Sequence, residues 1–135
     1  MGRAQVILVD THIVVWLAFA PDKLSRKARA AIDGARTRGE GVAISDITLL
    51  ELARLATDGR IKLTISVEAF LSEVEARFVV LPITARACVR AMALASPYPK
   101  DPADRIIAGT ALAEGRSLVT ADRHIISSRA LATIW

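Results

Sequence analysis

Residues 5–10 read QVILVD, a short run of aliphatic side chains that ends in an aspartate. A strand with apolar residues on both faces is typical of a parallel sheet that helices cover on either side. Three similar runs follow, GVAIS at 41–45, FVVLPI at 78–83 and SLVTAD at 117–122. The pattern predicts four strands of one parallel sheet.

Segments with helical spacing separate these runs, at 25–36, 46–59, 66–78, 84–95 and 102–114. Side chains that cap helices precede them, namely Ser45 or Asp46, Ser66, Thr84 and Asp101, while Gly59 and Gly115 suit helix ends. Strands that alternate with helices predict an α/β fold, a three-layer α/β/α sandwich with a central parallel sheet. The length of 135 residues fits a single domain over residues 1–135.

The composition restricts the partners and the compartment. The chain carries 18 Lys+Arg against 14 Asp+Glu, which fits an anionic partner such as nucleic acid, and equally a soluble protein that is simply not neutral. The single cysteine, Cys88, excludes an internal disulfide, is expected to be a small buried hydrophobe, and fits a cytoplasmic setting. No signal peptide and no membrane-spanning run of about 18 apolar residues is expected.

Acidic residues fall where the predicted strands end. Asp10 ends the first strand, Asp122 follows the last, and Glu51 lies about a turn into the helix after the second strand. Asp104 lies in the first turn of the helix that leads into the last strand. Because ligands of open α/β sheets bind beyond the carboxyl ends of the strands, we expect these acids to converge at one edge.

Each acid also has a purely structural explanation. Asp10 could occupy a turn, Asp122 could cap the turn DRHI, Asp104 could interact with a helix dipole, and Glu51 could face solvent. Taken together, these explanations do not account for the gathering of acids at the edge where ligands bind.

Carboxylates that cluster in a cleft repel one another, and a divalent cation usually holds them together. Oxygen ligands favour Mg²⁺ or Mn²⁺. Zinc is disfavoured because His12 and His124 are far apart in sequence and no second cysteine exists. His12 is expected to be packed or solvated, and Thr120 is the only hydroxyl or thiol expected near the acids. The chain has no glycine-rich phosphate-binding loop.

Four blocks of the sequence together resemble PIN-domain proteins, and more narrowly the VapC-type toxins of bacterial toxin–antitoxin pairs. The blocks are LVDTHIVVWLAFAPDKLS at 8–25, ISDITLLELARLATDGRIKL at 44–63, KDPADRIIAGTALAEG at 100–115 and LVTADRHI at 118–125. The resemblance implies an α/β/α sandwich and a Mg²⁺- or Mn²⁺-dependent endoribonuclease that acts on single-stranded or looped RNA. It also implies inhibition by a cognate antitoxin protein and a homodimer.

Carried over position by position, the resemblance matches the catalytic and metal-binding acids of the family to Asp10, Glu51, Asp104 and Asp122, and its small hydroxyl to Thr120. The chain differs from many relatives at Leu50, where they carry an aromatic residue, and at Pro99, where they carry a histidine.

The segment KDPADR at 100–105 contains two aspartates with different expected roles. Asp101 precedes Pro102 and is expected to cap the helix, whereas Asp104 is the expected metal ligand. Arg105 could hold the RNA backbone or pair with the carboxylates, as could the nearby Lys100 and Arg123.

Two other functions remain open. One is another Mg²⁺-dependent phosphohydrolase, although enzymes of the aspartyl-phosphate kind need an aspartate where this chain has His12. The other is a PIN-like module that binds RNA or protein without cutting, against which the complete set of acids argues.

Overall fold

A computed structural model of the protein describes residues 6–135, so Gln5 of the first predicted strand lies outside the described residues. The described chain forms a five-stranded sheet in the order β3-β2-β1-β4-β5, and every neighbouring pair is parallel. The strands are β1 (Ile7–Val9), β2 (Ala43–Ser45), β3 (Val79–Leu81), β4 (Ser117–Val119) and β5 (Thr133–Ile134).

Seven α-helices connect these strands within residues 6–135: α1 (Thr11–Phe19), α2 (Arg26–Thr37), α3 (Asp46–Thr57), α4 (Val67–Arg77), α5 (Ala85–Met92), α6 (Pro102–Glu114) and α7 (Arg123–Ser128). A short 3-10 helix, η1 (Pro21–Lys23), follows α1. None of the helices described is both long and apolar enough to cross a bilayer.

The helix boundaries follow the capping signals in the sequence. The side chains of Ser45, Ser66, Thr84 and Asp101 each accept a backbone N–H at the start of a helix. Gly115 ends α6 with a left-handed backbone, at a φ of 64° that side-chain-bearing residues rarely adopt. The predicted starts of α3 to α6 are therefore confirmed, with Ser45 rather than Asp46 as the cap of α3.

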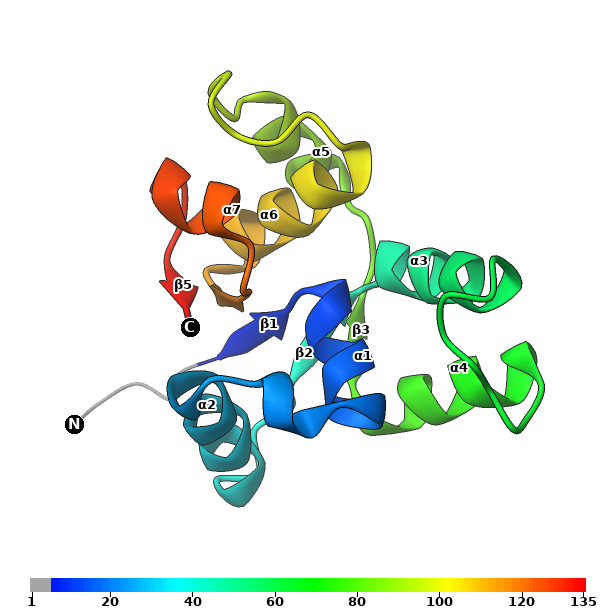
Figure 1. Cartoon of the computed structure of the whole chain (residues 1–135). Helices are drawn as coiled ribbons and strands as arrows, with labels where there is room; N and C mark the ends of the chain where they lie inside the picture. Colours follow the sequence, from blue (N-terminus) through cyan, green and yellow to red (C-terminus); the bar gives the residue numbers. More distant parts are fainter. Residues whose placement is uncertain (1–5) are drawn as a thin grey trace.

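The sheet separates two hydrophobic clusters, because successive strand residues point to opposite faces. Ile7 and Val9 pack with residues of α1, α2, α3 and α4, whereas Leu8 packs with residues of α6 and α7. Figure 1 shows α5, α6 and α7 on one side of the sheet and α1, α2 and α4 on the other. The predicted α/β/α sandwich is confirmed.

The sequence did not predict four elements, α1, η1, α7 and β5. η1 and α7 have only three and six residues, too few to show helical spacing. β5 spans only two residues at the chain terminus, too few to show a period. α1 is apolar almost all round, because it lies between the sheet and its neighbouring helices, and a helix of this kind shows no one-sided stripe. The predicted four strands thus become five among the described residues.

The predicted burial of Cys88 is wrong, because its side chain is exposed on α5. The helix buries Ala87 and Ala91, which lie four residues apart on one stripe. Cys88 follows Ala87 directly and therefore points away from that stripe.

The close approach of α5 and α6 depends on Gly109. A Cβ atom at this position would clash with the backbone oxygen of Ala87 and would lie 2.9 Å from the backbone nitrogen of Ala91. Gly109→Ala is therefore expected to destabilise the protein by about 1–3 kcal/mol, despite the better helix propensity of alanine. Urea denaturation monitored by circular dichroism measures this change.

Gly34→Ala in α2 is the matched control. Its added Cβ would meet only the flexible end of Arg38, so it is expected to be neutral or stabilising by up to about 1 kcal/mol. Equal behaviour of the two variants would show that the helix contact at Gly109 is looser than described.

Candidate active site

The carboxyl ends of β1 and β4 lie side by side at the switch point of the sheet, where the order of the strands reverses. After β1, the chain adds β2 and β3 on one side of β1, whereas β4 and β5 lie on the other side. Ligands of open α/β sheets bind at such a switch point. The backbone N–H of Asp10 donates to the carbonyl of Val119 at 3.0 Å. The residues that follow these two strands therefore lie side by side.

Asp10 is held at this point by hydrogen bonds on both carboxylate oxygens. It is 4% exposed, and its Oδ1 accepts the Thr11 backbone N–H at 2.9 Å. Its Oδ2 accepts the Thr120 hydroxyl at 2.8 Å, and Thr120 Oγ1 accepts the Asp122 backbone N–H at 3.1 Å. Thr120 thus connects the first acid of the chain to the loop that carries the last.

Glu51 reaches the same edge from the middle of α3. Its Oε1 accepts the Thr11 hydroxyl at 2.5 Å, and Thr11 Oγ1 lies 3.0 Å from Thr48 Oγ1. Burial raises the pKa of the half-buried Glu51 carboxyl against the effect of the Thr11 hydrogen bond, and the charges of Asp10 and Asp101 raise it further. Glu51 therefore does not simply face solvent.

Thr11 is a residue of the candidate site that sequence reasoning missed. The expectation that Thr120 is the only hydroxyl near the acids is wrong, since the Thr11 hydroxyl contacts Glu51 directly. The available signal was the position of Thr11 immediately after Asp10, at the first residue of α1.

The two aspartates of α6 differ in their contacts. Asp101 Oδ1 accepts the backbone N–H groups of Ala103 at 2.9 Å and Asp104 at 3.2 Å, which confirms the predicted cap. Asp104 is half-buried, and burial raises its pKa from 3.8 to about 7, with further contributions from the charges of Asp10, Asp101, Glu51 and Asp122. The structure thus brings Asp104 into the electrostatic range of the other three predicted acids.

Asp122 combines two of its possible roles. Its Oδ1 accepts the backbone N–H groups of His124 at 2.9 Å and Ile125 at 3.3 Å, and so caps α7. Its charge contributes to the raised pKa of Asp104. One oxygen is therefore committed to the helix while the carboxylate stays within the acidic cluster.

We call Asp10, Glu51, Asp104 and Asp122 the four acids. Among the residues described, the ion pairs are Arg38–Glu40 at 2.9 Å and Arg54–Asp58 at 3.9 Å, and His12 Nδ1 lies 3.7 Å from Asp10 Oδ2. None of these pairs neutralises Glu51, Asp104 or Asp122, although burial and mutual repulsion disfavour charge on Asp104.

The chemistry of this donor set fits a hard divalent cation, because all four side chains are carboxylates. In the positions that residues 6–135 occupy, no three acidic, histidine or cysteine side chains lie close enough together to hold one ion. The four acids lie at the same edge of the sheet but do not form a complete coordination sphere, so their side chains would have to turn towards a cation.

His12 is packed, which is one of the two alternatives that the sequence left open. Its Nε2 accepts the Ala121 backbone N–H at 3.0 Å, and its ring meets Trp16 edge to face at a centroid distance of 5.0 Å. The histidine therefore joins α1 to the loop between β4 and α7.

Arg105 points away from the acids. Its guanidinium donates to the carbonyls of Ala91 at 3.3 Å, Leu94 at 3.2 Å and Tyr98 at 3.3 Å. The Tyr98 hydroxyl in turn donates to the backbone oxygen of Asp104 at 3.3 Å. Arg105 thus holds the connection between α5 and α6 in place.

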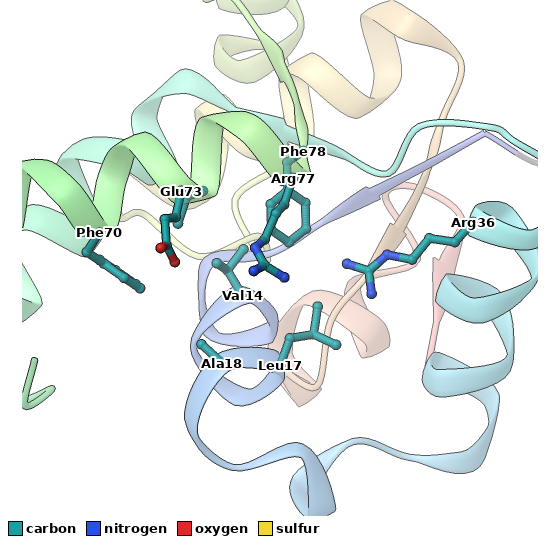
Figure 2. Close-up of a pocket in the computed structure, with 9 residues that line it drawn as sticks. Val14, Leu17, Ala18, Arg36, Phe70, Glu73, Arg77 and Phe78 are labelled. Carbon is teal, nitrogen blue, oxygen red and sulfur yellow. The ribbon is translucent and has the colours of Figure 1, made fainter. Parts of the chain in front are cut away.

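A cavity of about 330 Å³ lies elsewhere, between α1, α2 and α4. Leu17 forms part of its apolar wall, and Figure 2 shows the side chains of Arg36 and Arg77 extending towards the same opening, near Glu73. None of the four acids lines it. This cavity is separate from the acidic edge.

Comparison with known proteins identifies relatives of the whole chain. Residues 7–130 match the family described as PIN domain. The protein named ribonuclease VapC22 from Mycobacterium tuberculosis is 37% identical over 131 residues, which is 96% of this chain and 98% of that protein.

Solved structures share the fold at lower identity. A chain in the crystal structure of VapBC2 from Rickettsia felis, bound to a promoter DNA fragment, has a TM-score of 0.72 at 18% identity, covering 96% of this chain and 97% of that one. A chain in the structure of VapBC-1 from nontypeable Haemophilus influenzae has a TM-score of 0.69 at 18% identity, with 96% of each chain covered.

Proposed function

Since this chain belongs to the PIN-domain family, we propose that the four acids form the active site of a divalent-metal-dependent endoribonuclease, the toxin of a toxin–antitoxin pair. The ribonuclease and toxin assignment follows from the likeness to ribonuclease VapC22 over nearly the full length of both chains. The observation that carries the site is the placement of these acids at one edge of the sheet: Thr11 donates to both Asp10 and Glu51, and Thr120 connects Asp10 to the loop of Asp122. The charges of the other three acids also act on the half-buried Asp104.

The cation would be Mg²⁺ or Mn²⁺, and Asp10 and Asp104 would hold it, with Glu51 and Asp122 contributing directly or through water. When bound, such a cation offsets the charge that develops at phosphorus and lowers the pKa of a coordinated water. The carboxylate oxygens of this site match the ligand preference of these ions.

The other residues of the site orient the acids. Thr120 fixes the Asp10 carboxylate, and Thr11 fixes Glu51 through Oε1 only, which leaves Oε2 of Glu51 available. We assign Glu51 to orient the attacking water or accept its proton, because one Asp122 oxygen already caps α7. In-line attack then breaks the phosphodiester bond of a single-stranded or looped RNA.

Incubation of the purified protein with labelled structured RNA tests this function. Cleavage is expected with Mg²⁺ or Mn²⁺ and is expected to stop when a chelator removes the metal. Binding without cleavage would instead support a non-cutting module. Hydrolysis of a small phosphate ester in place of RNA would support a different phosphohydrolase.

An antitoxin partner is expected from the toxin–antitoxin structures that share this fold. We place a segment of that partner at the opening of the acidic edge, where a basic side chain among the four acids would compete with the metal. Addition of an equimolar cognate antitoxin is expected to stop cleavage, and unchanged cleavage would contradict the inhibition.

We also assign a homodimer, supported by exposed apolar side chains on and beside α5. These are Ile83, Val89 and Met92, which are 38%, 69% and 80% exposed. Val89 and Met92 lie three residues apart and share one helix face.

Met92→Glu is expected to convert the dimer into a monomer without unfolding it, because the substituted side chain is already exposed. Light scattering across micromolar concentrations measures the mass. Glu68→Lys on α4, also exposed, is the matched control and should leave the mass unchanged. A wild-type protein that is monomeric throughout this range would contradict the dimer.

A further inference from the structure

A groove of about 770 Å³ runs along α3 from the acidic edge to the end of the helix. Its volume lies within the range of about 300–1,000 Å³ that is typical of ligand sites. We call it the α3–α6 groove, because α3 and the first turn of α6 form its walls, with Thr11, Leu50, Glu51, Arg54, Arg60 and Pro102 among its lining.

The groove is continuous with the proposed active site. Glu51 and Thr11 belong to both, and Asp101 at the start of α6 lines the same end. A ligand in the groove would therefore lie directly beside a group that reacts at the four acids.

The side chains that line the groove are negatively charged at one end and mainly positively charged at the other. Arg54 lies three residues beyond Glu51 on the same helix face, where side chains are about 5–6 Å apart at Cβ. Gly59, at a φ of 74°, turns the chain back after α3, and the Arg60 backbone N–H donates to the Leu55 carbonyl at 2.9 Å. Two guanidinium groups and one carboxylate, that of Asp58, thus line the groove beyond the acids, which leaves this end with a net positive charge.

These arginines are available for a ligand. Arg54 contacts Asp58 only at 3.9 Å, with 84% of the Arg54 side chain exposed, and such surface pairs contribute little. In the described part of the chain, Arg60 takes part in no ion pair.

Apolar surface lies between the two charged ends. Leu50 is 65% exposed, and Ile47 and Pro102 line the groove beside it. Nucleic-acid bases pack on such surfaces when they are unstacked, as they are in single strands and loops.

We propose that the α3–α6 groove binds the nucleotide next to the cleaved phosphate, with Arg54 and Arg60 holding the adjoining phosphate. This subsite rests on the proposed function, because it requires one phosphate to lie at the metal. Arginine binds phosphate oxygens with two parallel N–H donors, which suits the basic end. An acidic peptide fits less well, since Glu51 and Asp101 would repel carboxylates at the other end.

Binding of a short, fluorescein-labelled single-stranded RNA of mixed sequence tests the subsite. Fluorescence anisotropy is measured in the Asp104→Asn background, so that the RNA stays intact. When Arg54→Gln and Arg60→Gln are introduced together into this background, RNA binding is expected to weaken roughly tenfold or more. The dependence of log K on log salt should become shallower by about 0.7, because the contact with one phosphate is lost.

The matched control is Arg26→Gln with Lys27→Gln, which removes the same charge from exposed positions of α2, outside the groove. It is expected to change affinity and salt dependence little. In the cleaving protein, Arg54→Gln with Arg60→Gln should raise KM and leave kcat nearly unchanged, as expected when uniform binding is lost. Thermal melts check that each variant is folded.

Equal RNA binding by the groove variant and the α2 variant would overturn the proposal. Loss of antitoxin binding with unchanged RNA binding would also overturn it and assign the groove to the antitoxin. A wild-type protein that binds RNA through these arginines but cleaves none would support the subsite while contradicting the proposed function.

Discussion

Asp104→Asn is expected to abolish RNA cleavage and to weaken Mn²⁺ binding strongly, while the protein remains folded. Asp104 is half-buried, and burial together with the four surrounding carboxylates raises its pKa to about 7. A cation offsets this repulsion, and the asparagine amide retains the size of the side chain but not its charge. Calorimetric titration with Mn²⁺ and a cleavage assay measure the two losses.

The stability of the same variant separates a lost ligand from a damaged fold. A raised pKa means that ionising Asp104 costs free energy in the metal-free protein, so stability falls as the pH rises from about 4 through about 7. Asparagine cannot ionise. Above pH 7, metal-free Asp104→Asn is therefore expected to melt at a higher temperature than metal-free wild type.

Asp101→Asn is the matched control, three residues away in the same turn. Asp101 is exposed and accepts two backbone N–H groups as a cap, and asparagine caps about as well as aspartate. Cleavage and metal affinity should change little, whereas Asp101→Ala should cost about 1 kcal/mol of stability. The assignment is reversed if Asp101→Asn loses the metal and Asp104→Asn keeps it.

Asp10→Asn is expected to lower the cleavage rate by orders of magnitude. Asparagine can keep the bond from the Thr11 backbone at Oδ1, so the start of α1 should persist. The charge that the metal needs is lost. The loss should exceed the roughly 10–100-fold effect that is typical when a residue that only positions a metal ligand is removed.

Thr120→Val provides that comparison, because Thr120 donates to Asp10 and reaches the metal only through it. Its expected effect is about 10–100-fold. Single-turnover cleavage rates with saturating Mn²⁺ show which of Asp10→Asn and Thr120→Val loses more activity, and thermal melts check that both variants are folded. Wild-type cleavage by a folded Asp10→Asn protein would show that the site is misassigned.

The sequence could predict the features that local chemistry decides. Uniformly apolar runs identified the strands β1 to β4, and serine, threonine and aspartate caps located the starts of four helices. Asp10 and Asp122 were predicted to be site residues because each of them directly follows a predicted strand or lies at its end. The rule that parallel strands place their carboxyl ends at one edge then predicted the location of the candidate site.

Contacts between distant segments were not predictable in this way. The pairing of β1 with β4 and the contact of Thr11 with Glu51 depend on the strand order, which no local pattern encodes. The role of Arg105 depends on three carbonyls from the end of α5 and from the connection that follows it. The side of α5 that is buried, and hence the exposure of Cys88, depends on α6.

The pairing of β1 with β4 has a consequence for synthesis in the cell. A ribosome releases the first strand long before the fourth, yet β1 lies between β2 and β4, and Asp10 receives its hydroxyl contact from Thr120. The nascent chain therefore holds Asp10 and Glu51 without Thr120 and Asp122 until the segment that contains β4 has been made. The proposed active site can assemble only after that segment has left the ribosome.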